Sequence, residues 1–230
     1  MNPDDLVGWL TFDDPRRGVV ARLLEHLEYT GLAVGLALLL ALPLGLVLGH
    51  YGRGGFLAVA LSNLGRAVPT LGVLVLLAIS PLGQSKEAVV YALALFAVPP
   101  LLTNTYVGMR EVDPEAVEAA RGMGMSPGQV LRRVELPLAF PLIAAGLRTA
   151  VLQVLATAVL AAAIGLGGLG RYLIDGLGSQ DDTQVLAGAI LVAGLALVVE
   201  VLLAGLQRAV DPTGRSRRRP TAAARADLQV

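Results

Sequence analysis

Residues 118–137 read EAARGMGMSPGQVLRRVELP, and the apolar stretches on both sides of them are too long for the core helices of a soluble domain. A helix needs about 20 consecutive apolar residues to cross the core of a bilayer. The pattern therefore predicts a membrane protein with one charged segment, interrupted by glycine and proline, at a membrane face. A soluble partner can grip such a segment.

The composition leads to the same class. Of 230 residues, 55% are hydrophobic and 16% are charged, whereas a typical soluble domain has about 25% charged residues. Blocks of Leu, Ala and Val predict helices, because backbone polar groups in lipid must be hydrogen-bonded within their own segment. The predicted fold class is an all-α membrane protein.

Other classes are disfavoured by the residues that the chain lacks or disperses. The net charge is zero, so nothing draws the whole chain to nucleic acid. There is no cysteine, and the two histidines, His26 and His50, are far apart, so we expect no disulfide and no metal site. The first residues are acidic and do not resemble a cleaved signal peptide.

Five apolar stretches predict five transmembrane helices, with Phe56–Leu64 as a weak stretch that leaves the count open. We expect Pro43 to kink the first helix and Pro99-Pro100 to break or bend the third. The approximate limits of the five are Tyr29–Leu48, Ala67–Ile79, Ala88–Val107, Leu138 to just before Gly165, and Val185–Leu206.

The distribution of Lys and Arg predicts the topology. With five spans and the N-terminus outside, twelve of these residues fall on inside segments and five on outside segments. Because inside loops carry the excess of basic residues, we expect an outside N-terminus and a cytoplasmic C-terminus. The predicted organisation is a polar segment 1–28 with an interfacial helix or a solvated tail, a transmembrane domain 29–210 with a cytoplasmic loop 109–137, and a basic, disordered tail 211–230.

The charged loop predicts two short helices separated by a glycine turn. Asp113–Glu115 is a helix start, with a capping side chain, a proline for the first turn and a charge that complements the dipole. Gly122 and Gly124 predict the end of that helix. Ser126–Gln129 predicts a second start with a capping box, and Pro137 predicts its end or a kink.

This shape suits docking, although a solvated connector would carry the same caps. Small side chains at Ala119 and Ala120 allow close approach to a groove. Four charged side chains can set the orientation of the docked helix: Glu118, Arg121, Arg132 and Arg133.

Polar residues within the predicted spans are candidates for the solute path. Charges in a membrane helix are costly and are commonly functional. Arg148 and Glu200 can line the path or lock one state through an ion pair, and a purely structural pair is the alternative. Asn104 and Gln153 are further candidates for the path, or for hydrogen bonds between helices.

The loop resembles the EAA motif of ABC-transporter permeases, in which Glu-Ala-Ala is followed by Gly, a branched residue and Leu-Pro at fixed spacing. This chain has Glu118-Ala119-Ala120, Gly124, Val134 and Leu136-Pro137. Further stretches look like the osmoprotectant branch, among them PTL at 69–71, VELP at 134–137, GLRTA at 146–150 and GGLG at 167–170.

The resemblance implies a fold and a function. The implied fold is a type I ABC importer permease with a core like that of methionine permeases. The implied function is ATP-driven import of glycine betaine, choline, carnitine, proline betaine and related quaternary ammonium compounds into a bacterial cell across its plasma membrane. This chain lacks a phosphate-binding loop, so we expect it not to be an enzyme and to bind no cofactor, with ATP-Mg held by a partner.

The implied partners are a cytoplasmic ABC ATPase dimer, a second permease subunit that is identical or paralogous, an extracytoplasmic solute-binding protein and membrane lipid. The residues that the motif assigns to ATPase coupling are Glu118, Ala119, Ala120, Arg121, Gly124, Leu136 and Pro137. The glycine run 165–170 is either a docking point for the binding protein or a helix terminus.

Two further expectations concern how the solute is bound and which class of transporter the chain belongs to. Quaternary ammonium groups are commonly held by aromatic cages, but aromatic residues make up only 4% of the chain, so we expect no tight cage in this subunit. A permease for an amino acid such as methionine is the nearest alternative. A secondary transporter, a channel or a passive anchor is less favoured, because none of these needs the charged loop.

Overall fold

The computed structural model describes residues 3–56, 60, 63, 65 and 67–210, and these residues form helices joined by turns, with no β-strand among them. Four helical stretches are long and apolar enough to cross a membrane: Val19–His50, Lys86–Arg110, Pro127–Ile164 and Asp182–Ala209. The long helices are α2 (Val19–His50), α5 (Lys86–Arg110), α8 (Leu136–Thr157) and α10 (Asp182–Val210). The shorter elements are α1 (Pro3–Leu10), α4 (Thr70–Ala78), α6 (Pro114–Gly122), α7 (Pro127–Val130), the π-helix η1 (Leu131–Glu135), the 3₁₀-helix η2 (Ala158–Ile164) and α9 (Gly170–Ser179).

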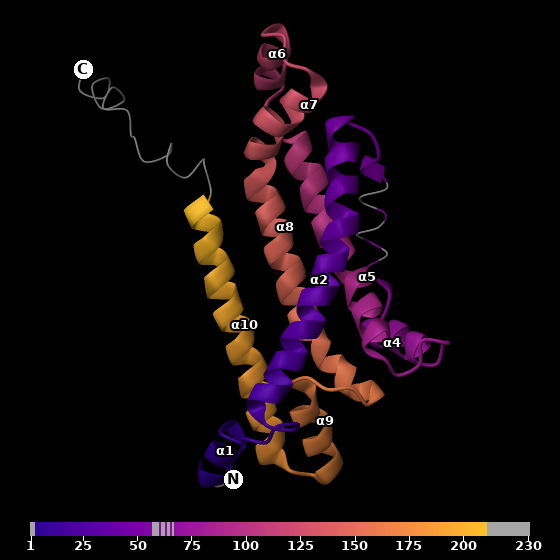
Figure 1. Cartoon of the computed structure of the whole chain (residues 1–230), viewed down its shortest axis with the longest axis vertical. Helices are drawn as coiled ribbons and strands as arrows, with labels where there is room; N and C mark the ends of the chain where they lie inside the picture. The colour runs from indigo at the N-terminus through magenta and orange to yellow at the C-terminus, as the bar shows by residue number, and fades with distance from the viewer. Residues whose placement is uncertain (1–2, 57–59, 61–62, 64, 66, 211–230) are drawn as a thin grey trace, which may run out of the picture.

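Contacts between the long helices fix their directions. Helices α2 and α5 run parallel, because Lys86 bonds to Glu28 near their starts and Gly49 packs on Met109 near their ends. Helix α8 runs the other way, and α10 is antiparallel to α8. Helix α10 therefore runs toward the end of the bundle that carries α6 and α7 and stops short of them, level with α8, while α1 lies at the opposite end (Figure 1). The predicted positions of the two termini relative to the membrane stay a prediction.

The second predicted span differs from a single long helix. The helix α4 in this stretch is nine residues long and spans about 13 Å, too little to cross a bilayer core of about 30 Å alone. Because α2 and α5 are parallel, the chain still passes from one end of the bundle to the other between them. Part of the weak stretch 56–64, and the tail 211–230, lie outside the described residues.

Proline does not break the long helices, so the expectation for the third span is wrong in its stronger form. Pro43 lies inside α2, and Pro99-Pro100 lie inside α5, which runs uninterrupted to Arg110. Pro100 has no N–H to donate to the carbonyl oxygen of Phe96, and the side-chain amide of Gln153 on α8 donates to that oxygen over 3.3 Å. Neighbouring side chains can satisfy carbonyls near a proline in this way, which is why proline is tolerated in membrane helices.

Residues 19–28 are the first turns of α2 and do not form a separate interfacial helix or a solvated tail. At 32 residues, α2 is about 48 Å long and exceeds the core of a bilayer. The first turns therefore extend beyond the span, together with α1, whose Trp9 donates its indole N–H to Asp181 over 3.2 Å.

The core consists largely of small residues, because glycine and alanine allow helix backbones to approach closely. Fully buried alanines line the contact of α2 with α5, namely Ala33, Ala37, Ala92 and Ala97. A Cβ atom added at Gly45 of α2 would lie 2.7 Å from Cβ of Thr105 on α5. At Gly45 the backbone of α2 therefore packs directly against α5.

Gly45→Ala is expected to lower the free energy of unfolding by about 1–3 kcal/mol, as added methyl groups do in close-packed interiors. Gly35→Ala in the same helix is the matched control, because its Cβ would meet nothing within 4 Å. Thermal unfolding of the purified chain in detergent measures both. Equal melting temperatures for the two variants would show that α2 and α5 do not pack as described.

Candidate functional site

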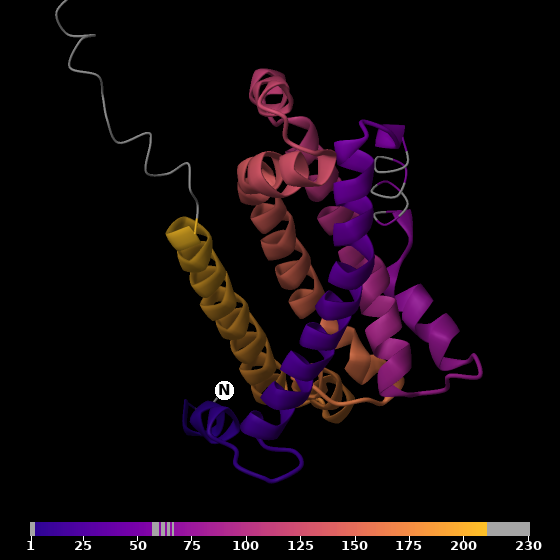
Figure 2. The same cartoon turned by 45° about the horizontal axis from the view of Figure 1, so that its top comes forward.

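The charged loop projects from one end of the bundle. Helices α6 and α7 stand beyond the ends of α5 and α8 (Figure 2). Asp113 accepts the backbone N–H of Glu115 over 2.9 Å, and the Gln129 side chain accepts the Ser126 N–H over 2.8 Å. Gly124, between the two helices, has φ +80°, a left-handed conformation that glycine adopts without strain. The predicted order of helix, glycine turn and helix is confirmed.

The structure places the predicted coupling residues on one segment but not all at its surface. Glu118, Ala119, Arg121, Gly124 and Pro137 are exposed, Leu136 is partly buried, and Ala120 is buried with 1% of its surface exposed. Ala120 therefore packs inward and supports α6, and only Ala119 of the two alanines is open to a partner. Among described residues, no hydrogen bond or ion pair engages the side chains of Glu118, Arg121, Arg132 and Arg133.

The second loop helix does not end at Pro137, contrary to one expectation. A π-helical turn, η1, joins α7 to α8, and the Leu136 N–H bonds to the carbonyl oxygen of Leu131. Proline removes a backbone donor and crowds the preceding turn, and a widened turn leaves room for its ring. The helix is therefore continuous from Pro127 to Ile164.

A buried polar pair lies at the base of the loop, and sequence reasoning missed it. Glu135 of η1 is 5% exposed, and its Oε2 lies 2.5 Å from Nδ1 of His50, the last residue of α2. His50 and Glu135 are 85 positions apart, and no spacing rule links them. The pair connects the loop directly to α2.

Two of the predicted path residues are brought together. Asn104 of α5 and Gln153 of α8 line one small cavity of about 140 Å³. The Gln153 amide donates to the carbonyl oxygen of Phe96 over 3.3 Å. At Gly146 an added Cβ would lie 2.5 Å from Cβ of Asn104, so α5 and α8 are in close contact here. The Gln153 bond joins α8 to α5, whereas the Asn104 amide bonds to Pro100 within its own helix.

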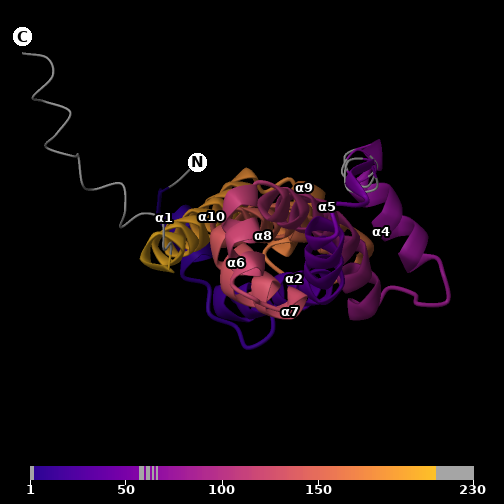
Figure 3. The same ribbon diagram turned by 90° about the horizontal axis from the view of Figure 1, so that it is seen from above.

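Arg148 and Glu200 lie elsewhere, on the contact of α8 with α10. Arg148 Nε donates to Glu200 Oε2 over 2.7 Å, and a second guanidinium nitrogen also contacts the carboxylate. Further along the same contact, Gln207 donates to the carbonyl oxygen of Pro141 over 3.3 Å. Helix α10 lies at the edge of the bundle (Figure 3), and these polar contacts hold it to α8.

Arg148→Leu is expected to lower the melting temperature, because it leaves the Glu200 carboxylate without its cation inside a span. The double variant Arg148→Leu/Glu200→Leu is expected to recover most of the loss, as apolar replacements of buried ion pairs commonly do. Thermal unfolding and solute uptake are measured for both. Full uptake in the double variant identifies a structural pair, whereas stable protein without uptake places the pair in the transport cycle.

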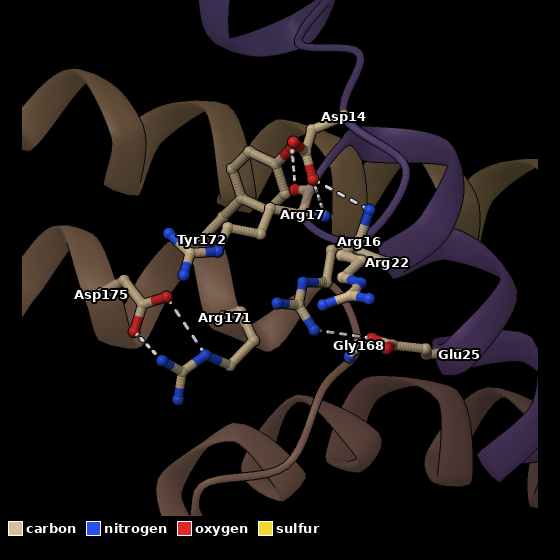
Figure 4. A network of polar contacts seen from close by, with 9 residues as sticks. All are labelled: Asp14, Arg16, Arg17, Arg22, Glu25, Gly168, Arg171, Tyr172 and Asp175. Carbon is tan, nitrogen blue, oxygen red and sulfur yellow. Dashed lines mark hydrogen bonds and ion pairs between the residues drawn. The ribbon is translucent and has the colours of Figure 1, made fainter.

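At the opposite end of the bundle, a cleft of about 590 Å³ lies between α1, the start of α2 and α9. Figure 4 shows the polar side chains around it. The lining includes Trp9, Phe12, Arg17, Arg22, Arg171, Tyr172 and Asp175. Apart from the glycine run 165–170, no sequence signal pointed to this cleft, because its lining comes from two distant segments, within residues 9–22 and 165–184.

The glycine run 165–170 forms one wall of the cleft. Gly165 and Gly168 have φ of +86° and +87°, and the Gly168 N–H donates to Glu25 of α2 over 2.7 Å. A Cβ at Gly167 would collide with the Glu25 carboxylate. The run is thus a turn in close contact with another helix, as the plainer expectation had it.

Comparison with known proteins defines the class. Residues 41–215 match the family model of the binding-protein-dependent transport system inner membrane component, and the chain belongs to this family. It is therefore a multi-pass membrane permease of the ABC-transporter type, located in a bacterial inner membrane.

Within this family, the chain is similar to permeases of osmoprotectant transport systems. The chain is 38% identical to the choline transport system permease protein OpuBB of Bacillus subtilis over 84% of this chain and 88% of that protein. It is 36% identical to the glycine betaine/carnitine/choline transport system permease protein OpuCB of the same organism, over 83% and 87%. It is 34% identical to the osmoprotectant import permease protein OsmW of Salmonella typhimurium, over 83% and 90%.

Solved structures share the fold. An inward-facing form of the MetNI methionine ABC transporter matches with a TM-score of 0.74 and 21% identity, covering 86% of this chain and 99% of that chain. An amino acid ABC transporter with histidines matches with a TM-score of 0.65 and 22% identity, covering 84% and 92%. The expected core like that of methionine permeases is confirmed.

Proposed function

We propose that this chain is the permease subunit of an ATP-driven importer of quaternary ammonium osmoprotectants such as glycine betaine, choline and carnitine. The observation that carries the proposal is the exposed EAA segment. Its helix caps and glycine turn give it a defined shape, and the side chains of Glu118, Arg121, Arg132 and Arg133 have no hydrogen bond or ion pair with a described residue. The similarity to permeases of choline, glycine betaine and carnitine transport systems supports the choice of solute.

The loop is the site where ATP hydrolysis acts on the permease. Glu118, Ala119, Arg121 and Gly124 face outward on or next to α6 and would seat in a groove of a cytoplasmic ATPase. Ala120 and Leu136 hold the helices in place, and Pro137 marks the start of α8. When the ATPase dimer closes, α6 moves as a rigid lever, and η1 passes the displacement into α8 and, through His50, into α2.

A binding-protein-dependent importer needs further partners besides the ATPase. A second permease copy or a paralogue would complete the path, and a separate binding protein would deliver the solute. Large apolar side chains of α10 are more than half exposed, including Leu197, Val198, Val201, Leu202 and Leu206. Lipid or the second permease would cover this face, since nothing in the described chain does. Asn104 and Gln153 are the candidates nearest a solute path.

Radiolabelled uptake decides between this proposal and the amino-acid alternative. Cells that express the complete transport system are tested with glycine betaine, choline, carnitine and methionine. Saturable uptake of one or more quaternary ammonium compounds without methionine uptake is expected. Uptake of methionine without any quaternary ammonium compound would instead identify the chain as an amino-acid permease, a class whose fold it shares.

A further inference from the structure

The cleft between α1, α2 and α9 carries one guanidinium group in excess. Arg22 pairs with Glu25 at 2.8 Å, and Arg171 pairs with Asp175, with Nε 3.1 Å from the carboxylate. The Arg17 guanidinium lines the same cleft but has no hydrogen bond or ion pair with any described residue (Figure 4). The cleft therefore presents one cation, with five potential N–H donors, that is attracted to the Asp14 carboxylate but has no hydrogen bond or ion pair with a described residue.

The backbone holds Arg17 in this position. The N–H groups of Arg16 and Arg17 donate to the Asp14 carboxylate over 2.9 and 2.7 Å, and these bonds lower the pKa of Asp14 below its ordinary value. The Tyr172 hydroxyl reaches the carbonyl oxygen of Arg17 over 3.4 Å, and burial raises the pKa of Tyr172, so the hydroxyl stays neutral. Arg17 thus extends from a fixed turn.

Aromatic rings form the other part of the lining. Trp9 meets Phe12 at a centroid distance of 5.7 Å and an interplanar angle of 62°, and it meets Tyr172 at 5.9 Å and 83°. The whole chain has one Trp, five Tyr and four Phe, so this concentration is unusual for it. Rings at steep angles form a corner whose faces attract a quaternary ammonium group by cation–π interaction.

We propose that this cleft is a solute site for quaternary ammonium compounds that also carry a carboxylate, with the carboxylate on Arg17 and the ammonium group against the Trp9 corner. A volume of about 590 Å³ lies within the usual range of small-molecule sites, about 300–1,000 Å³. The proposal departs from the expectation of no tight cage in this subunit, because Trp9 lies in contact with both Phe12 and Tyr172. The inference rests on the proposed osmoprotectant function.

The charges select within that solute class. Glycine betaine and carnitine bring one carboxylate, which would satisfy the one unpaired guanidinium of the cleft. Choline has the same ammonium group but no carboxylate, and it would leave Arg17 unpaired beside a second positive charge. The site therefore favours carboxylated solutes over choline.

Trp9 is the only tryptophan in the chain and reports directly on the site. The full chain is reconstituted in liposomes without any binding protein, and its tryptophan emission is followed during titration with glycine betaine. A saturable change is expected, with a weaker response to choline and none to sucrose at equal osmolality. Absence of a saturable change with glycine betaine overturns the proposal.

Matched variants test each half of the site. Arg17→Gln is expected to raise the half-saturating concentration of glycine betaine by about tenfold or more, since it removes a charge-assisted hydrogen bond. Arg16→Gln removes the same charge one position away, outside the cleft lining, and is expected to change nothing. Phe12→Leu is expected to weaken binding of both glycine betaine and choline. Equal effects of Arg16→Gln and Arg17→Gln contradict the assignment of the carboxylate to Arg17.

Failure of this inference is distinguishable from failure of the proposed function. If cells import glycine betaine while Trp9 does not respond to it, the chain is an osmoprotectant permease without this site. If the complete system imports no quaternary ammonium compound, the proposed function itself is wrong.

Discussion

Replacing Gly124 by valine is expected to uncouple the permease from its ATPase while leaving the bundle folded. The residue has φ +80°, and a side chain there would meet no atom within 4 Å. The penalty is therefore conformational, about 1–2 kcal/mol for the left-handed region and more for a β-branched residue. We expect the turn to leave the left-handed conformation, which relieves the strain and changes the angle between α6 and α7. We expect solute uptake to fall at least about tenfold.

A charge reversal tests the same docking surface in another way. Glu118 is exposed and has no partner among the described residues, so Glu118→Lys is expected to leave the melting temperature unchanged. If α6 seats in the ATPase, the reversed charge opposes binding, because like charges facing each other across an interface cost several kcal/mol. Less ATPase should then copurify with the tagged permease.

Gly122→Ala is the matched control for Gly124→Val. Gly122 is the last residue of α6, is helical, and has open space around it, so the added methyl group is expected to change neither stability nor uptake. The Gly124→Val and Glu118→Lys variants could both show normal ATPase copurification and normal uptake. That result would show that this loop does not couple the permease to the ATPase.

Glu135→Ala is expected to be the most destabilising single change near the loop. The side chains of His50 and Glu135 are only 11% and 7% exposed, and their polar atoms are 2.5 Å apart. Removal of one partner leaves the other buried and unsatisfied, a change that typically costs about 3–5 kcal/mol in buried pairs. Thermal unfolding should show a marked drop, and uptake should fall because α2 loses its polar connection to η1.

The double variant His50→Leu/Glu135→Leu separates stability from coupling. Apolar replacement of both partners is expected to restore the melting temperature, because no polar group is then left buried alone. If this pair carries the motion of the loop into α2, uptake stays low in the stable double variant. Restored uptake would make the pair a structural contact only. Glu115→Ala, at an exposed position of the same loop, is the control for loss of a carboxylate.

Local patterns predicted the parts of this molecule that depend on neighbouring residues. The caps at Asp113 and Ser126 and the turn at Gly124 depend on residues within three or four positions, and the structure has all of them. Pro137 was misjudged, because whether a proline ends a helix depends on whether the turn before it can widen. The π-helical turn depends on how α8 continues into the bundle, and no local pattern records that.

The cleft between α1, α2 and α9 and the pair at the base of the loop lay beyond sequence reasoning for a different reason. Arg17 and Tyr172 are 155 positions apart, and His50 and Glu135 are 85 apart. Their meeting depends on the parallel run of α2 and α5 and on the return of α8, which bring distant segments to the same level of the bundle.

By itself, the sequence determined that this is a helical membrane protein with one shaped and charged docking loop, because span length and helix capping are local properties of the chain. Only the tertiary structure decided which polar residues meet. It paired Arg148 with Glu200 away from Asn104 and Gln153, and it gathered Trp9, Phe12 and Tyr172 at the cleft that Arg17 lines. The physical reason is that helix packing, set by small residues such as Gly45 and Gly146, fixes the level at which each side chain faces its neighbours.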